Sequence, residues 1–94
     1  MKDIKNKRIN VNYVITESIK INNIEYVLGK HQLTEKYVTW YYANKTYYYG
    51  HYIDDYKTAK IDLYNRVIDE MEYLKGEFQN RIKYLEKGRN NENK

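Results

Sequence analysis

The sequence predicts an α+β fold: an antiparallel sheet of about four strands, arranged as two hairpins, followed by one long C-terminal amphipathic helix. Two observations predict this fold. The first half of the chain alternates apolar and polar residues around two short asparagine-containing turns, and the second half spaces its apolar residues by three and four. The 94 residues make one domain, 1–94, in which we expect 1–8 and 89–94 to be flexible tails.

The first strands are predicted from alternation and from a turn signal. Residues 9–15 alternate as a half-buried strand, and residues 18–28 form a hairpin that turns at Asn22-Asn23. Asparagine tolerates the positive φ of a tight two-residue turn, so this pair suits a hairpin. Residues 29–36 are then a polar connection to the second hairpin.

The second hairpin is dense in tyrosine and pairs residues 37–43 with 46–52 about Asn44-Lys45. A regular two-residue turn predicts four opposed pairs: Ala43 with Thr46, Tyr41 with Tyr48, Thr39 with Gly50, and Tyr37 with Tyr52. Val38, Trp40, Tyr42, Tyr47, Tyr49 and His51 then share the other face. Both faces are aromatic and one helix covers only one of them, so we expect the other to be available to a partner or to a second copy.

The helix is predicted from an N-cap and from thirty residues of regular apolar spacing. Asp54 or Asp55 is a suitable cap. The apolar positions that follow are Tyr56, Ala59, Leu63, Val67, Met71, Leu74, Phe78, Ile82 and Leu85. A continuous helix over 55–88 is ~50 Å long, whereas a seven-residue strand spans only ~23 Å. Either the helix breaks near Gly76 and folds back, or the stripe Phe78, Ile82 and Leu85 packs on another chain as a dimer or partner contact. We favour the second.

Composition sets several classes of function aside. The chain has no cysteine, which removes thiolate nucleophiles, and it lacks glycine-rich phosphate loops. His31 and His51 are the only imidazoles, and we interpret His51 as a strand-end histidine bonded to a carboxylate near the helix cap. We therefore expect no enzyme activity, no metal and no cofactor. No apolar run is long enough to cross a membrane, so we expect a soluble, cytoplasmic protein without a membrane partner.

The tyrosine surface indicates a binding protein. Tyrosine and tryptophan are enriched at the centres of protein interfaces, and the second hairpin carries only one lysine. We expect a larger protein to contact six residues: Tyr41, Tyr48, Tyr52, Asp54, Asp55 and Asp62. The alternative is a small RNA- or DNA-binding accessory protein that uses Lys45, Lys57 and Lys60. The stretch Lys57-Thr58-Ala59-Lys60 resembles the helix start of double-stranded-RNA-binding domains, although Tyr56 stands where that family has a lysine.

A second resemblance covers residues 37–66. Trp40, the run Tyr49-Gly50-His51-Tyr52, Ala59, Asp62 and Arg66 resemble small proteins carried by phages and mobile elements of low-GC bacteria. The abundance of Lys, Asn, Ile and Tyr agrees with AT-rich coding. This resemblance implies an anti-CRISPR-like inhibitor that evades host defence by a stoichiometric protein–protein contact. Its partner would be a CRISPR effector or another defence nuclease in a bacterial host cell.

Overall fold

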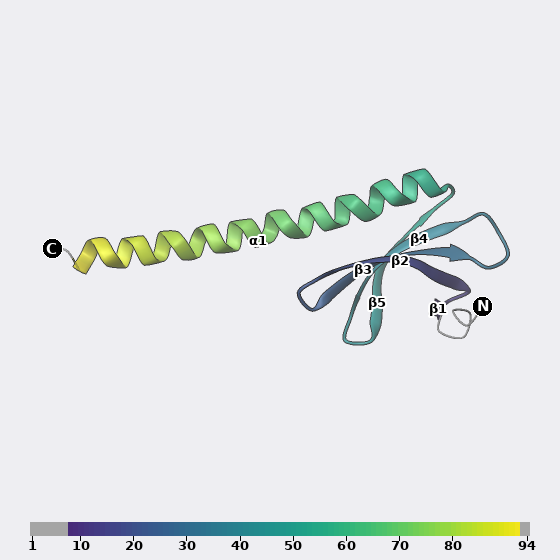
Figure 1. The fold of residues 1–94 in the computed structure, drawn as a ribbon, viewed down its shortest axis with the longest axis horizontal. Helices are drawn as coiled ribbons and strands as arrows, with labels where there is room; N and C mark the ends of the chain where they lie inside the picture. The colour runs from purple at the N-terminus through teal and green to yellow at the C-terminus, as the bar shows by residue number, and fades with distance from the viewer. Residues whose placement is uncertain (1–7, 93–94) are drawn as a thin grey trace.

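The computed structural model describes residues 8–92. It consists of a five-stranded antiparallel sheet followed by one long helix (Figure 1). The strands lie in sequence order, so each is hydrogen-bonded to the strand that follows it. The elements are β1 (Ile9–Asn10), β2 (Tyr13–Ile21), β3 (Ile24–His31), β4 (Tyr37–Ala43), β5 (Thr46–Ile53) and α1 (Tyr56–Glu92). The α+β class and the long C-terminal helix are confirmed.

The sheet has one more strand than the sequence indicates, because the predicted strand over residues 9–15 is divided by a turn. Val11 and Asn12 have positive φ angles of 48° and 68°, and they join β1 to β2 as a third hairpin. Asn12 suits positive φ, but valine is a poor turn residue because its branched Cβ disfavours it, so the pair is a weak turn signal inside an alternating strand pattern. The predicted turns at Asn22-Asn23 and Asn44-Lys45 are confirmed. The connection after β3 is shorter than expected, because β3 continues to His31.

A bulge in β5 changes the predicted register of the second hairpin. Ala43–Thr46 and Tyr41–Tyr48 pair as expected, but Thr39 pairs with His51 and Tyr37 with Ile53. The extra residue lies at Tyr49, whose φ is 53°. A single inserted residue moves every later side chain to the opposite face of the sheet. The predicted pairs Thr39–Gly50 and Tyr37–Tyr52 are therefore wrong.

The two faces of the sheet each bury their own cluster. On the face that α1 covers, Tyr26 and Leu28 of β3 pack with Ala59 and Leu63 of the helix. On the other face, the buried residues are Tyr13, Val27, Val38 and Trp40. Arg8 closes the edge of this second cluster: its guanidinium pairs with Glu25 at 2.8 Å and lies over the Tyr42 ring. The expectation that a whole aromatic face stays open is wrong, because this face packs on itself; Tyr52 is its main exposed ring.

The helix begins with the predicted cap and does not break. Asp55 accepts a hydrogen bond from the backbone N–H of Thr58 at 2.8 Å, as an N-cap should. The 37 residues of α1 run through Gly76 and on to Glu92, four residues into the predicted C-terminal tail. Only the first part packs on the sheet, and the remainder projects from it (Figure 1), so the molecule is 68 Å long. No helix in the described range is apolar over a length that would cross a membrane.

Candidate functional site

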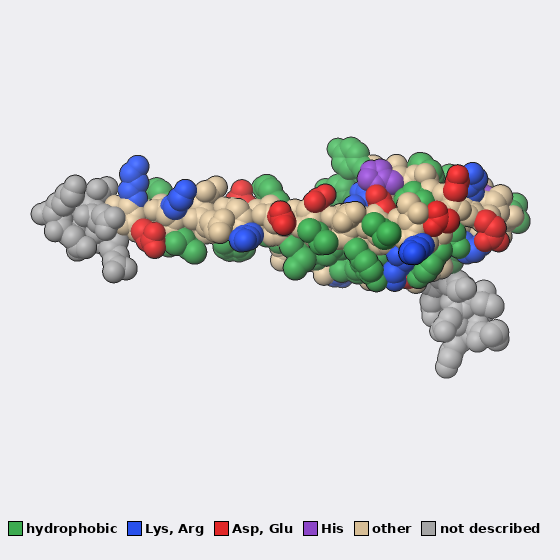
Figure 2. All heavy atoms as spheres, turned by 90° about the horizontal axis from the view of Figure 1, so that it is seen from above, with side chains coloured by type: hydrophobic (Ala, Val, Ile, Leu, Met, Phe, Trp, Pro, Cys, Tyr) green, Lys and Arg blue, Asp and Glu red, His purple; other side chains and the backbone are tan. Residues whose placement is uncertain are grey.

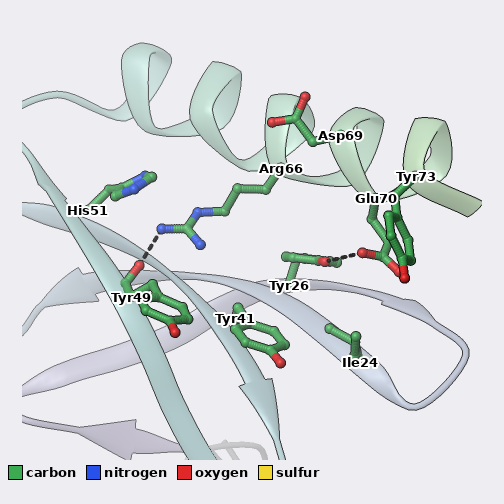
Figure 3. Close-up of a pocket in the computed structure, with 9 residues that line it drawn as sticks. All are labelled: Ile24, Tyr26, Tyr41, Tyr49, His51, Arg66, Asp69, Glu70 and Tyr73. Carbon is green, nitrogen blue, oxygen red and sulfur yellow. Dashed lines mark hydrogen bonds between the residues drawn. The ribbon is translucent and has the colours of Figure 1, made fainter.

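A groove opens where the middle of α1 leaves the sheet. The helix and the tips of the β2–β3 and β4–β5 hairpins diverge (Figure 1), and the space between them has a volume of about 530 Å³. We call it the tyrosine groove, and Figure 3 shows its lining: Ile24, Tyr26, Tyr41, Tyr49, His51, Arg66, Asp69, Glu70 and Tyr73. Three strands and two turns of the helix contribute to it, so it exists only in the folded chain.

Tyrosine rings form a continuous row on this face of the sheet, and Tyr26, Tyr41 and Tyr49 of that row line the groove. Tyr26, Tyr41 and Tyr48 are register partners on β3, β4 and β5, which brings their rings side by side. Tyr26 and Tyr41 stack at 6.1 Å between centroids, and Tyr41 lies 5.3 Å from Tyr48. Tyr49 joins the row because the bulge turns it to the same side, where its ring is nearly parallel to Tyr41 at 6.0 Å. Such pairs contribute ~0.5–1.5 kcal/mol each beyond burial.

Arg66 fixes the position of the bulge. Its guanidinium donates to the backbone carbonyl of Tyr49 and, through Nε, to the hydroxyl of Thr39 at 3.0 Å. Thr39 is fully buried, and its hydroxyl donates to Asp62. A carbonyl in a bulge has lost its strand partner, so a charged donor from the helix replaces the missing bond. The orientation of Tyr49 thus depends on Arg66.

Asp62 is the centre of this network. His51 contacts it through Nδ1 at 2.9 Å, and Arg66 lies 3.4 Å away through Nε. Partial burial alone raises the pKa of Asp62, but the hydrogen bonds from Thr39 and His51 outweigh burial and lower this pKa below its ordinary value of 3.8. The carboxylate is therefore ionised at neutral pH and joins strand β5 to the helix. The predicted histidine–carboxylate bond exists, but it reaches Asp62 and not the capping carboxylates.

The outer rim of the groove is acidic and aromatic. Tyr26 donates to Glu70 at 3.2 Å, and burial together with the Glu70 charge raises the pKa of Tyr26 to about 12. This phenol therefore stays protonated at physiological pH. Asp69, Tyr73 and the ring of Tyr49 are exposed, and Tyr49 shows 75% of its surface. Carboxylates beside open aromatic rings attract a cationic side chain, since the ring face and the carboxylate both favour positive charge.

The structure separates the six predicted contact residues. Tyr41 and Tyr48 lie together in the tyrosine row. Tyr52 lies on the opposite face, 5.9 Å from the Tyr13 ring, because of the bulge. Asp55 caps the helix, and Asp54 pairs with Lys36 at 2.7 Å near the helix start. Asp62 is held inside its network, so the six do not form one surface.

The three predicted nucleic-acid lysines are also separated. Lys45 lies in the β4–β5 turn, at the far end of the sheet from the start of α1, where Lys57 is exposed. Lys60 contacts Glu17 at 2.6 Å and lies over the Tyr64 ring, and the hydrogen bond that it donates to Glu17 raises the pKa of this ammonium. The residues of the predicted stripe, Phe78, Ile82 and Leu85, lie near one another on the projecting part of α1. Each of these side chains is more than half exposed.

Most of the groove was not identified from the sequence. Tyr26, Tyr49, Arg66, Asp69, Glu70 and Tyr73 line it, and none was among the predicted contacts. One signal was present: an isolated glycine inside a strand, Gly50, often marks a bulge. A Cβ at Gly50 would lie 2.7 Å from Nε1 of Trp40, so only glycine fits beside the indole.

Within residues 8–92, no group of three His, Cys, Asp or Glu side chains is arranged to hold a metal ion. No protein-family model, curated protein or solved structure matches the chain. Function must therefore be inferred from the groove and the helix themselves.

Proposed function

We propose that this chain is a non-catalytic binding protein that holds a larger protein partner in the tyrosine groove. One observation carries the proposal: the tyrosine row ends in a ring, Tyr49, that a bulge turns outward and Arg66 fixes in place. Rigid tyrosines supply contact area at low entropic cost, which is why they dominate the centres of protein interfaces. A bulge that re-aims a side chain at the edge of a sheet is typical of a functional position.

The rim supports a partner segment that carries lysine or arginine. The side chain of such a residue would lie beside the Tyr73 ring and reach Asp69 or Glu70 with its charge, at the opposite end of the groove from Tyr49. A desolvated contact of this kind is worth ~2 kcal/mol from the cation–π part alone. Arg66 does not neutralise the rim, because its guanidinium is already bonded to Tyr49, Thr39 and Asp62.

The experiment is an affinity capture from a lysate of the organism that encodes the chain, with wild type, Tyr49→Ala and Tyr84→Ala as baits. Tyr84 is an equally exposed tyrosine on the projecting helix and serves as the matched control. We expect the captured protein to be retained by Tyr84→Ala and weakened at least about tenfold by Tyr49→Ala, the loss typical of an interface centre. Equal capture by Tyr49→Ala and wild type would remove the groove from the proposal.

The resemblance to phage and mobile-element proteins supports a finer form of this proposal. The partner would be a nucleic-acid-handling defence complex such as a CRISPR effector, and the chain would inhibit it by occupying a surface in a one-to-one complex. A purified effector and its cleavage assay test this form. Inhibition should reach completion at equimolar protein and be lost with Tyr49→Ala.

Nuclease treatment of the same lysate distinguishes a protein partner from the alternative, in which the chain binds RNA or DNA. A partner that disappears after treatment would be bound through RNA or DNA, and a mobility shift that weakens steeply with salt would then support the lysine surface. We expect capture to be unaffected, because the three lysines of that alternative lie apart and Lys60 is paired with Glu17.

A further inference from the structure

The projecting half of α1 carries a second surface that the tyrosine groove does not use. Its apolar residues continue the spacing of the sheet-covered half: Met71, Phe78 and Leu85 recur every seven residues, with Leu74 and Ile82 beside them. All five are at least partly exposed. A seven-residue apolar repeat on a helix is the pattern of helix–helix pairing. A helical segment of this length without packing is also marginally stable in water, so a partner helix would stabilise it.

Charge along this segment is divided in two. Beyond the groove lining, residues 74–77 and the neighbouring Glu72 contain two carboxylates and one lysine, whereas residues 81–87 contain three basic side chains and one glutamate. Figure 2 shows most acidic side chains of the projecting helix nearer the sheet and most basic ones nearer the C-terminal end, with hydrophobic side chains spread along its length. The segment is therefore acidic at one end, basic at the other and apolar along its length.

Such a segment is complementary to a reversed copy of itself. An antiparallel pair about a two-fold axis near residues 79 and 80 would place the acidic end of each helix beside the basic end of the other. Leu74 would then face Leu85 of the second copy, and Arg81, which lies over its own Phe78 ring at 4.9 Å, would face Phe78 and Glu77 of that copy. A parallel pair would instead set acidic beside acidic and basic beside basic.

From this pattern, we propose that the projecting half of α1 is a homodimer interface in which two copies pair antiparallel. The two sheets then lie at opposite ends of the dimer, and the apolar stripe contributes no residue to the tyrosine groove, whose helix lining is Arg66, Asp69, Glu70 and Tyr73. The occupant is a second copy of this chain and not an unrelated helix, because the charge pattern is self-complementary.

Sedimentation of the full chain from low micromolar to submillimolar concentration tests the association. We expect a monomer–dimer equilibrium that is weakened at high salt, since the paired charges are exposed. Ile82→Glu should shift the midpoint concentration upward at least about tenfold, whereas Ile61→Glu, an equally exposed isoleucine away from the stripe, should not. A monomer at every concentration, or equal effects of the two variants, would overturn the proposal.

Orientation is tested separately with single cysteines, because the chain has none of its own. Leu74→Cys and Leu85→Cys proteins are mixed and oxidised under equilibrating conditions. Antiparallel pairing predicts the mixed 74–85 disulfide as the main product. Predominant 74–74 and 85–85 products would show parallel pairing and contradict the proposal, even if a dimer forms.

Discussion

The two halves of α1 share one apolar spacing but lie in different surroundings. The first half packs on β3, β4 and β5, and its Ala59 and Leu63 are almost completely buried. The second half continues past the sheet, and Phe78, Ile82 and Leu85 are more than half exposed. The same periodicity therefore forms a hydrophobic core in one place and a free surface in the other. Periodicity shows which side of a helix is apolar, whereas the extent of the sheet decides which residues it buries.

The largest contrast should come from the same substitution in each half. Leu63→Ala removes a side chain that is 1% exposed beneath the sheet and should cost about 2–5 kcal/mol of unfolding free energy. Leu85→Ala removes one that is 68% exposed and should change the free energy by no more than about 0.5 kcal/mol in dilute protein. Urea denaturation at low micromolar protein measures both. Comparable losses would mean that the second half is packed within the monomer.

Two glycines give a contrast of opposite sign. Gly50→Ala forces a Cβ against the buried Trp40 ring and should destabilise the fold by about 1–3 kcal/mol. Gly76→Ala meets nothing within 4 Å in the middle of the helix, so it should stabilise by about 0.5–1 kcal/mol. Thermal unfolding of the two variants is the measurement. A destabilising Gly76→Ala would show that the helix needs a close approach at this position.

Acid should act on the network under the first half of the helix. The fold lowers the pKa of Asp62, so the stability from this carboxylate is present above its unfolded pKa of 3.8 and is lost as pH falls through its lower folded value. Asp62→Asn should reduce stability at neutral pH by about 1–3 kcal/mol and flatten the decline below about pH 4.

Asp69→Asn serves as the control, because Asp69 is an exposed carboxylate on the same helix. Asp69→Asn should leave the loss of folding stability at low pH nearly unchanged. In Asp62→Asn, part of this loss of stability should persist. The residual slope is expected because the pKa values of Glu17 and Glu25 are also lowered by their basic partners, against the opposing effect of burial. An identical acid profile for wild type and Asp62→Asn would show that the network does not depend on this charge.

Local patterns allowed much of the fold to be predicted, and contacts between distant residues decided the rest. The asparagine turns, the Asp55 cap and the unbroken helix follow from residues near one another in sequence. The Val11-Asn12 turn had only a weak local signal, because valine disfavours positive φ, and the bulge at Tyr49 was indicated only by the neighbouring Gly50. That bulge moved Tyr52 away from Tyr41, while Arg66 and Glu70 reached the groove through the crossing of helix and sheet. A site built from such a crossing is not visible in residue spacing alone.

Amide hydrogen exchange along α1 tests most directly whether one helix serves two purposes. We predict slow exchange at Leu63 and Val67 at every protein concentration, because the sheet covers them. Phe78 and Ile82 should exchange rapidly in dilute protein and become protected only as concentration rises and the second halves pair. Equal protection of both halves in dilute protein, or rapid exchange at Phe78 and Ile82 at all concentrations, would contradict this account.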